Sequence, residues 1–272
     1  MNLRTAVRDL LSHFPVADGL FRRLLWSKVR FPEVEMRFLN ALPPASIDIA
    51  LDVGAAHASY AWILHRKANR VFAFEPGKDH GDYLEKVFRG TDIQLIRAAV
   101  GERAANVKMY TPGKDAHALH SATLSSNNPV AETEGTIVRE VKQIALDDII
   151  SQYGLEGRRI DFIKVDIEGY ELNAFLGARR ILATHTPLVF CEIEKRHNSD
   201  YGKVFELFKS LGYTTYAFIE NAFVPFDYHQ IESVQSPKAL KIRLSPNHDA
   251  KKNTYINNFV FQHPDSRIKV KV

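Results

Sequence analysis

Short, continuously apolar segments alternate along this chain with longer segments whose apolar residues recur every three or four positions. Continuous apolar segments are typical of strands buried on both faces, and the second pattern is typical of amphipathic helices. The pattern predicts strands at residues 47–53, 70–75, 93–100, 161–166, 188–193, 213–219 and 257–261, and helices at 58–67, 79–88, 171–184 and 201–211. This alternation predicts an α/β fold, in which a mostly parallel sheet is covered by helices on both faces.

Residues 106–145 interrupt the alternation. Two β-prone segments, 107–110 and 136–144, flank a polar stretch rich in Ser, Asn, His and Thr. Long loops in compact domains are usually functional or disordered, so we expect a hairpin whose loop lies near the rim of an active site. Directly after it, Asp147 stands where an N-cap belongs and predicts a short helix.

The N-terminal segment, residues 1–45, is predicted to be mainly helical, with prolines that divide it into pieces. Within residues 1–30, Arg and Lys are spaced among Leu, Phe and Trp in an amphipathic pattern. Two alternatives stay open for this segment. It is either a helical cap or subunit interface, which would accompany a homo-oligomer, or a helix that makes peripheral contact with a membrane surface. Residues 46–272 are expected to form one further domain.

The composition narrows the class of protein. Hydrophobic residues make up 45% of the 272 residues and charged residues 25%, as in ordinary soluble globular proteins. No apolar stretch reaches the roughly 18 residues that a membrane span needs, and the N-terminus lacks the features of a signal peptide. A net charge of +4 without a basic stripe argues against a nucleic-acid partner. Cys191 is the only cysteine, which excludes an intramolecular disulfide and fits a reducing, cytoplasmic compartment.

Two neighbouring predicted strands each end in an acid. Asp52 ends the first and is followed by Gly54, and Glu75 ends the second and is followed by Pro76. Ligands of open α/β sheets bind at the carboxyl ends of the strands, where small residues allow close approach and a carboxylate accepts hydrogen bonds from ribose hydroxyls. The glycine-rich dinucleotide fingerprint is missing, so a nucleoside cofactor without a pyrophosphate is favoured over the NAD of an oxidoreductase.

Five short motifs follow one another in the order found in the FkbM family of S-adenosylmethionine-dependent O-methyltransferases, which the sequence resembles over roughly residues 47–195. They are Leu51-Asp52-Val53-Gly54-Ala55, Phe74-Glu75-Pro76, Ala99-Val100-Gly101, Leu146-Asp147-Asp148 and Ile163-Lys164-Val165-Asp166-Ile167-Glu168-Gly169-Tyr170-Glu171. The Lys-x-Asp-x-Glu-Gly run is the most discriminating of them. The resemblance implies a class I methyltransferase fold, Rossmann-like, with seven strands of which the last is antiparallel.

The resemblance also implies S-adenosylmethionine as the cofactor and a set of residues that hold it. Asp52 and Gly54 would lie at its methionine end, Glu75 at its ribose, and the segment around Ala98 and Ala99 against its adenine. The complete expected set is Asp52, Gly54, Ala55, Glu75, Pro76, Ala98, Ala99 and Asp166.

The sequence departs from the family at two positions after the first strand. Family members usually carry Asn-x-Gly there, whereas this chain has Ala56 and Ala58. Alanine supplies neither the hydrogen bonds of an asparagine side chain nor, without cost, the left-handed backbone of a glycine. A cofactor-binding, non-catalytic subunit of the same fold therefore stays open as the alternative function.

Charged residues gather at the ends of the fourth and fifth predicted strands, beside the expected cofactor. Lys164, Asp166 and Glu168 are predicted to be catalytic, with Asp166 nearest the transferred methyl group, and His197 is the candidate general base. Asp166 and Glu192 could also bind a divalent cation, and oxygen ligands suit Mg²⁺. The expected reaction is methylation of a hydroxyl of a small molecule, with a sugar of a glycan, glycolipid or glycosylated natural product as the acceptor.

Overall fold

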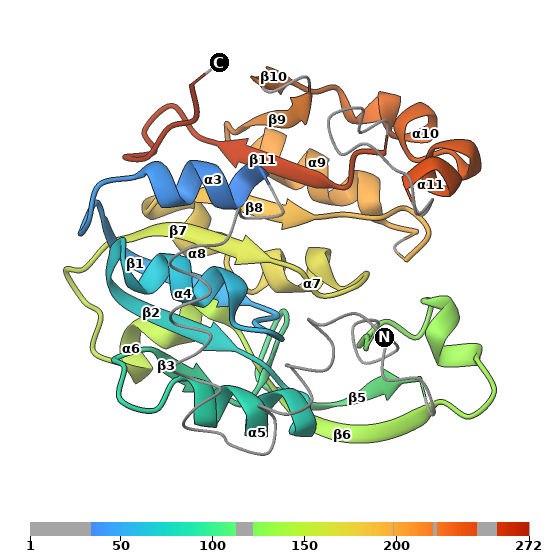
Figure 1. The fold of residues 1–272 in the computed structure, drawn as a ribbon, viewed down its shortest axis with the longest axis horizontal. Coiled ribbons are helices and arrows are strands. Elements are labelled where there is room, and N and C mark those ends of the chain that lie inside the picture. Colours follow the sequence, from blue (N-terminus) through green and yellow to red (C-terminus); the bar gives the residue numbers. More distant parts are fainter. Residues whose placement is uncertain (1–33, 113–121, 198, 220–221, 244–254, 272) are drawn as a thin grey trace, which may run out of the picture.

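Eight strands form a central sheet in the computed structural model, which describes residues 34–112, 122–197, 199–219, 222–243 and 255–271 (Figure 1). Their order is β10-β9-β11-β8-β7-β1-β2-β3. The bounds are β1 Ile47–Val53, β2 Ala68–Phe74, β3 Gln94–Ile96, β7 Ile160–Val165, β8 Leu188–Glu192, β9 Thr214–Ile219, β10 Ala222–Pro225 and β11 Asn258–Gln262. Strands β3, β2, β1, β7 and β8 are parallel, whereas β11 is antiparallel to both β8 and β9.

The predicted fold class is confirmed, and the number of strands is one higher than expected. The additional strand is β10, which pairs antiparallel with β9 at the edge of the sheet. Its four residues, Ala222–Pro225, end in a proline, which cannot donate a ladder hydrogen bond and is tolerated only at such an edge.

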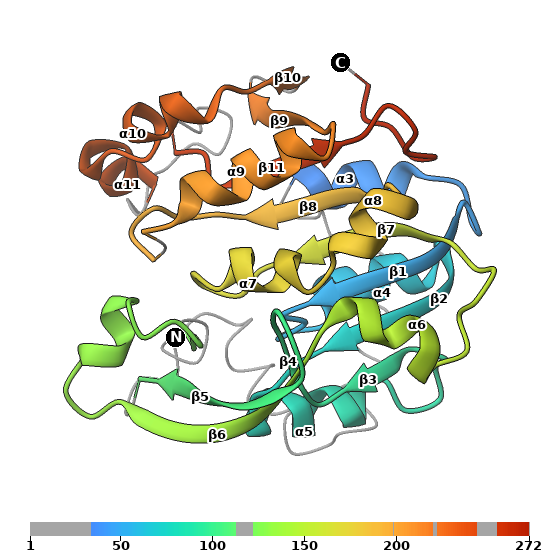
Figure 2. The same cartoon turned by 180° about the vertical axis from the view of Figure 1, so that it is seen from behind.

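Helices cover both faces of the sheet, as the front and back views show (Figures 1 and 2). Helices α3, α4 and α5 pack on one face, and α6 to α9 on the other, each over its own apolar cluster. The bounds are α3 Val34–Ala41, α4 Ser59–His65, α5 Lys78–Val87, α6 Ile149–Gln152, α7 Glu171–Leu176, α8 Arg179–Thr184, α9 Tyr201–Ser210, α10 Ile231–Val234 and α11 Pro237–Arg243, with short 3₁₀ helices η2 Pro129–Glu132, η3 Leu146–Asp148 and η4 Tyr228–Gln230.

Helix α3, the described part of the predicted N-terminal segment, belongs to the core. Met36 and Leu39 are buried against the sheet, and the ring of Phe38 lies 5.9 Å from that of Phe190. The predicted amphipathic helix within residues 1–30 lies outside the described residues. Among the residues that are described, no helix is both long and apolar enough to cross a membrane.

The predicted strand at 93–100 is in fact two strands that belong to different sheets. Residues 94–96 form β3 of the central sheet, and then the chain turns away, so that β4 (Ala99–Val100) pairs with β6 (Ile137–Ile144). Strand β6 also pairs antiparallel with β5 (Ala105–Thr111), which confirms the predicted hairpin. The second sheet, in the order β4-β6-β5, lies beyond the carboxyl end of the central strands (Figure 1).

The predicted helix at 171–184 is also divided. Helices α7 and α8 meet at Gly177, where a Cβ atom would lie 2.0 Å from the carbonyl oxygen of Gly101. Asp147 was predicted to cap the short helix that follows it, and this prediction is wrong. Its carboxylate accepts hydrogen bonds from the backbone N–H groups of Arg180 and Ile181, both at 2.9 Å, and so caps α8.

Candidate functional site

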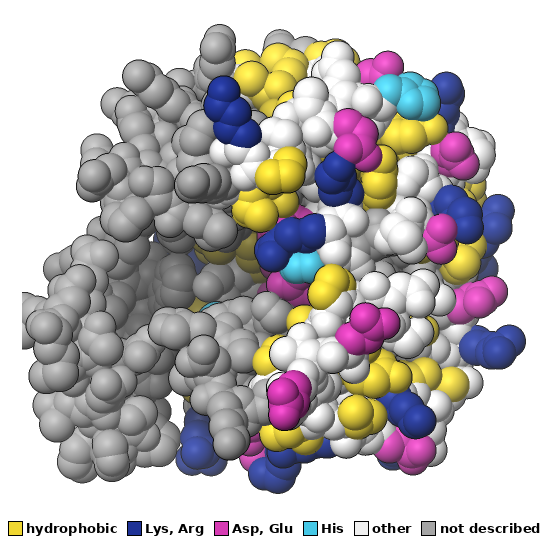
Figure 3. Space-filling view, turned by 90° about the vertical axis from the view of Figure 1, so that its right-hand side faces the viewer, with side chains coloured by type: hydrophobic (Ala, Val, Ile, Leu, Met, Phe, Trp, Pro, Cys, Tyr) yellow, Lys and Arg dark blue, Asp and Glu magenta, His cyan; other side chains and the backbone are white. Residues whose placement is uncertain are grey.

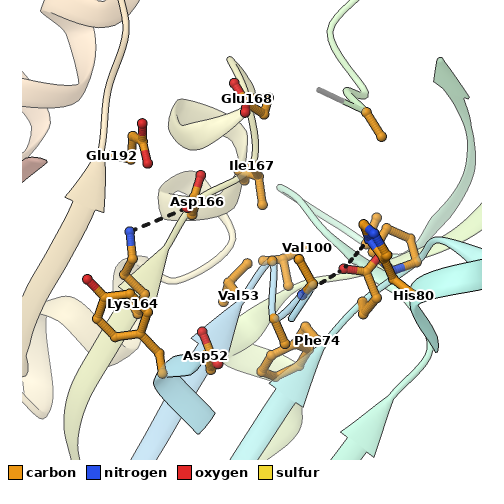
Figure 4. Close-up of a pocket in the computed structure, with 18 of the residues that line it drawn as sticks. Asp52, Val53, Phe74, His80, Val100, Lys164, Asp166, Ile167, Glu168 and Glu192 are labelled. Carbon is orange, nitrogen blue, oxygen red and sulfur yellow. Dashed lines mark hydrogen bonds and ion pairs between the residues drawn. The ribbon is translucent and has the colours of Figure 1, made fainter. Parts of the chain in front are cut away.

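A cavity of about 350 Å³ lies at the carboxyl ends of β1, β2, β7 and β8 (Figure 4). Parallel strands end at the same edge of a sheet, so the acids that were predicted separately from four strand ends meet here. The predicted site residues that line the cavity are Asp52, Gly54, Ala55, Glu75, Pro76, Ala98, Ala99, Lys164, Asp166, Glu168 and Glu192.

The turn after β1 is tightly constrained. Gly54 has a φ of 84°, and a Cβ atom at this position would lie 1.9 Å from the carbonyl oxygen of Asp166. Glycine is therefore required by the close passage of the chain after β7, in addition to any approach of a ligand. Ala56 and Ala58 also have positive φ, 34° and 65°, a conformation that costs residues with a side chain about 1–2 kcal/mol. The departure from the family pattern is thus a point of backbone strain.

Glu75 is fixed between two turns. Its Oε1 accepts a hydrogen bond from the backbone N–H of Gly77 at 2.7 Å, and its Oε2 accepts one from Ala56 at 3.1 Å. Burial raises the pKa of this carboxyl to about 7, although the two backbone hydrogen bonds oppose that change. The Nδ1 atom of His80 lies 3.9 Å from Oε2. The carboxylate is therefore held rigidly at the cavity wall, with lone pairs left for a ligand.

Asp52 presents a buried oxygen that lacks a partner. The residue is 2% exposed and lines the cavity, and its Oδ2 has no hydrogen-bond partner among the described residues. Burial raises the pKa of its carboxyl to about 7, and the positive charge of Lys164 works against this. Buried polar atoms are nearly always hydrogen-bonded, so this oxygen suits a donor group that a ligand would bring.

Lys164 is a cation among the acids that line the cavity, Asp52, Asp166 and Glu192 (Figure 4). It is 2% exposed, its Nζ lies 3.8 Å from Oδ2 of Asp166, and it sits 5.1 Å from the centre of the Tyr60 ring. Glu192, opposite, accepts a hydrogen bond from the side-chain amide of Asn257. Burial, together with the charge of Asp166, holds the pKa of the Glu192 carboxyl well above its usual range.

The predicted magnesium site is not supported. Nowhere in the described parts of the chain do three His, Cys, Asp or Glu side chains come together in a way that could hold a metal ion. The two expected ligands are engaged elsewhere, because Asp166 faces the ammonium group of Lys164 and Glu192 faces Asn257.

Glu168 and His197 form a pair at the far end of the cavity. The Nδ1 atom of His197 lies 2.5 Å from Oε2 of Glu168, but only Glu168 is among the residues that line the cavity. His197 was the predicted base, but it lies behind Glu168, and it is Glu168 that borders the cavity. A Cβ atom at Gly169 would lie 2.2 Å from the carbonyl oxygen of His197, which explains the glycine of the Glu-Gly motif.

Several lining residues were not predicted, because their elements reach the site only through tertiary packing. They are Met36 from α3, Tyr60 from α4, His80 from α5, Met109 from β5, and Thr123 and Leu124 from the insertion. The sequence signal for the last three was the polar stretch at 106–145, which had been expected near the rim. Arg97, by contrast, points away and pairs with Asp82 at 2.7 Å and Glu85 at 2.9 Å.

Comparison with known families agrees with this geometry. The family model described as the methyltransferase FkbM domain matches residues 52–215. The chain belongs to the FkbM methyltransferase family. The match contains the strand-end acids and the residues of the insertion that line the cavity in this FkbM protein, Met109, Thr123 and Leu124.

Solved structures of similar fold are distant in sequence. The FkbM methyltransferase of Methylobacillus flagellatus KT is 19% identical, with a TM-score of 0.47, and the match covers 87% of this chain and 47% of that one. The chain thus spans about half the length of that protein. An O-methyltransferase of Bacillus cereus, solved in complex with SAH, is 12% identical, with a TM-score of 0.43 and coverage of 94% and 96%. No curated protein sequence matches the chain significantly.

Proposed function

We propose that this FkbM protein transfers a methyl group from S-adenosylmethionine to a hydroxyl of a small molecule, and that the acceptor is a sugar of a glycan, glycolipid or glycosylated natural product. The observation that carries the proposal is the pair of buried acids, Asp52 and Glu75, on one cavity at the ends of adjacent strands. The choice of a sugar rests on the family resemblance.

The chain offers a suitable partner for each part of the cofactor. The remaining lone pairs of the Glu75 carboxylate would accept hydrogen bonds from the two ribose hydroxyls, each worth about 1.5–3 kcal/mol. The orphan Oδ2 of Asp52 would accept one from the ammonium group of the methionine part. Ala98 and Ala99 would lie against the adenine. When bound, S-adenosylmethionine supplies an electrophilic methyl group on a sulfonium ion.

The chain's own contribution to chemistry lies at the other end of the cavity. Glu168 would accept the proton of the acceptor hydroxyl. His197, whose Nδ1 contacts Oε2 of Glu168, would hold the Glu168 carboxylate in place. A positioned base is worth about 10²–10⁴ in rate. The ammonium group of Lys164, 3.8 Å from Oδ2 of Asp166, would orient that carboxylate, and Glu192 would bind a second hydroxyl of the acceptor.

The rival candidate is a cofactor-binding subunit without turnover. Ala56 and Ala58 stand where family members carry Asn-x-Gly, and their backbone is strained. This favours the alternative, because the turn after β1 is then less well adapted to catalysis than in the family. The two functions differ only after the cofactor is bound. Titration calorimetry with S-adenosylmethionine would give binding in both cases, and a titration with NAD gives none.

The deciding experiment is a screen for transfer of a radiolabelled methyl group to glycan and lipid-linked sugar fractions. Label should appear in a product that survives alkali, since a methyl ether does and a methyl ester does not. The control is Glu168→Gln, which keeps the shape of the side chain and removes the base. Cofactor binding without transfer to any fraction would favour the non-catalytic subunit.

A further inference from the structure

The insertion between β4 and β6 makes direct contact with the residue that meets the acceptor. The hydroxyl of Thr123 and the side-chain amide of Asn128 both donate hydrogen bonds to the carbonyl oxygen of Glu168, each at 2.8 Å. We propose that Thr123 and Asn128 are positioning residues, which hold the Glu168 backbone so that its carboxylate stays on His197 and faces the acceptor. This inference rests on the proposed function and names two residues that determine the geometry of its base.

The two donors are themselves rigidly placed. Thr123 is 2% exposed, and its backbone exchanges both hydrogen bonds with Tyr110 of β5, at 3.0 and 2.8 Å. Asn128 is 1% exposed, and its Oδ1 caps η2 by accepting a hydrogen bond from the N–H of Val130 at 3.0 Å. The Thr123 hydroxyl also accepts a hydrogen bond from the N–H of Ser125, so both side chains are already held by a neighbouring N–H group and lose little further freedom when they bind Glu168. Thr123 and Asn128 therefore act as a fixed support for Glu168.

Glu168 needs such support because its backbone is strained. Its φ is 53°, a left-handed conformation that residues with a side chain rarely adopt, and Gly169 follows with a φ of 100°. On the other side of the turn, Glu171 accepts a hydrogen bond from the N–H of Gly169 at 2.7 Å. A strained backbone conformation is maintained only where several surrounding contacts hold it in place.

Release of the Glu168 carbonyl would let its φ relax to negative values. That change turns the direction of the side chain, so the 2.5 Å contact with Nδ1 of His197 would be lost. The cofactor contacts at Asp52 and Glu75 are made by other strand ends and would not change. The insertion would thus affect the chemical step and leave cofactor binding intact.

Two isosteric substitutions remove one donor each. Thr123→Val deletes the hydroxyl, which also accepts a hydrogen bond from the backbone N–H of Ser125 at 3.0 Å. Thr123→Ser is its matched control, since it keeps a hydroxyl that can make both hydrogen bonds. Asn128→Asp removes the amide donor but keeps the oxygen that caps η2. We expect Thr123→Val and Asn128→Asp each to lower kcat by about tenfold, with the acceptor KM and the Kd for SAH changed by less than about twofold, and Thr123→Ser to retain kcat within about threefold of the original protein.

A double-mutant cycle separates positioning from general damage. In a Glu168→Gln background the base is already gone, so adding Thr123→Val or Asn128→Asp should lower the residual rate by less than about twofold. A full tenfold loss in that background would overturn the inference. So would a Thr123→Ser variant as slow as Thr123→Val.

If the original protein transfers no methyl group, that result refutes the proposed function but not the positioning role. A structural measurement then tests the positioning role by itself. Crystals of the Thr123→Val/Asn128→Asp double variant with SAH should show Glu168 at negative φ and its carboxylate away from His197. An unchanged positive φ, with the contact to His197 intact, would refute the positioning role.

Discussion

Replacement of Asp52 by asparagine should make the protein more stable and a poorer cofactor binder. Burial raises the pKa of this carboxyl from 3.8 to about 7, which means that the folded protein binds its proton more tightly than the unfolded chain does. Each pKa unit corresponds to about 1.36 kcal/mol, so the ionised carboxyl lowers the free energy of unfolding by about 4 kcal/mol at pH 8. Asparagine has the same shape and carries no charge.

The sign of the pH dependence follows from linkage. Between pH 4 and pH 7 the folded state holds a proton at Asp52 that the unfolded state has released, so stability falls as the pH rises through this window and is level above it. The stability advantage of Asp52→Asn should therefore grow by about 2–3 kcal/mol between pH 5 and pH 8.

Urea unfolding of both proteins at these two pH values measures the difference, and Asp79→Asn, an exposed position on α5, is the matched control. Calorimetry with S-adenosylmethionine at pH 8 should show at least about tenfold weaker binding by Asp52→Asn, since the anionic partner of the ammonium group is lost. A stability difference that is the same at both pH values would refute the reasoning about burial. Unchanged affinity would remove Asp52 from the cofactor site.

Four further predictions concern other parts of the chain. Glu75→Ala should weaken S-adenosylmethionine binding by at least about tenfold in calorimetry, whereas Glu85→Ala, on the exposed side of α5, should not. Methyl transfer should be unaffected by excess EDTA, and a loss that Mg²⁺ restores would reinstate the metal site. Asp48→Ala should lower the free energy of unfolding, measured in urea, by about 1–3 kcal/mol, because it removes the hydrogen bonds that Asp48 accepts from Arg158. The guanidinium group of Arg158 holds the pKa of Asp48 below its usual range, so the stabilisation by Asp48 is lost as the pH falls below about 4. Deletion of residues 1–30 should reduce flotation with liposomes if this segment is a membrane-surface helix, and equal flotation would leave the cap or subunit interface.

The local pattern of the sequence predicted the central sheet except for its edge strand β10 and the end of β3. Strands buried on both faces are continuously apolar, and the strand at 47–53 and its neighbours were found for that reason. The acids at the strand ends could be predicted as a group because parallel topology brings strand ends together. What each acid does depends on its surroundings, and the sequence could not reveal that Oδ2 of Asp52 would have no hydrogen-bond partner in the part of the chain that the structure describes.

The errors have a common physical cause, which is that partners distant in the chain decide local structure. Residues 93–100 are mostly apolar, with Gln94 and Arg97 as the exceptions, yet they divide between two sheets because β6 offers a second pairing partner. Asp147 has the right side chain for an N-cap, but the helix it caps is α8. His197 was chosen by its distance from a strand end, and only the fold places Glu168 between it and the cavity.

Backbone packing is sufficient to require the glycines of the two central motifs, Gly54 and Gly169. A side chain at Gly54 would strike the carbonyl oxygen of Asp166, and one at Gly169 would strike that of His197. Both glycines thus allow backbone segments beside the cavity to pass one another closely. The same close approach brings Asp166 beside β1 and His197 beside Glu168, so both glycines shape the cavity through backbone packing. A substitution at either position should therefore disturb folding and the cavity together, whereas substitutions of Asp52 or Glu168 separate the two effects.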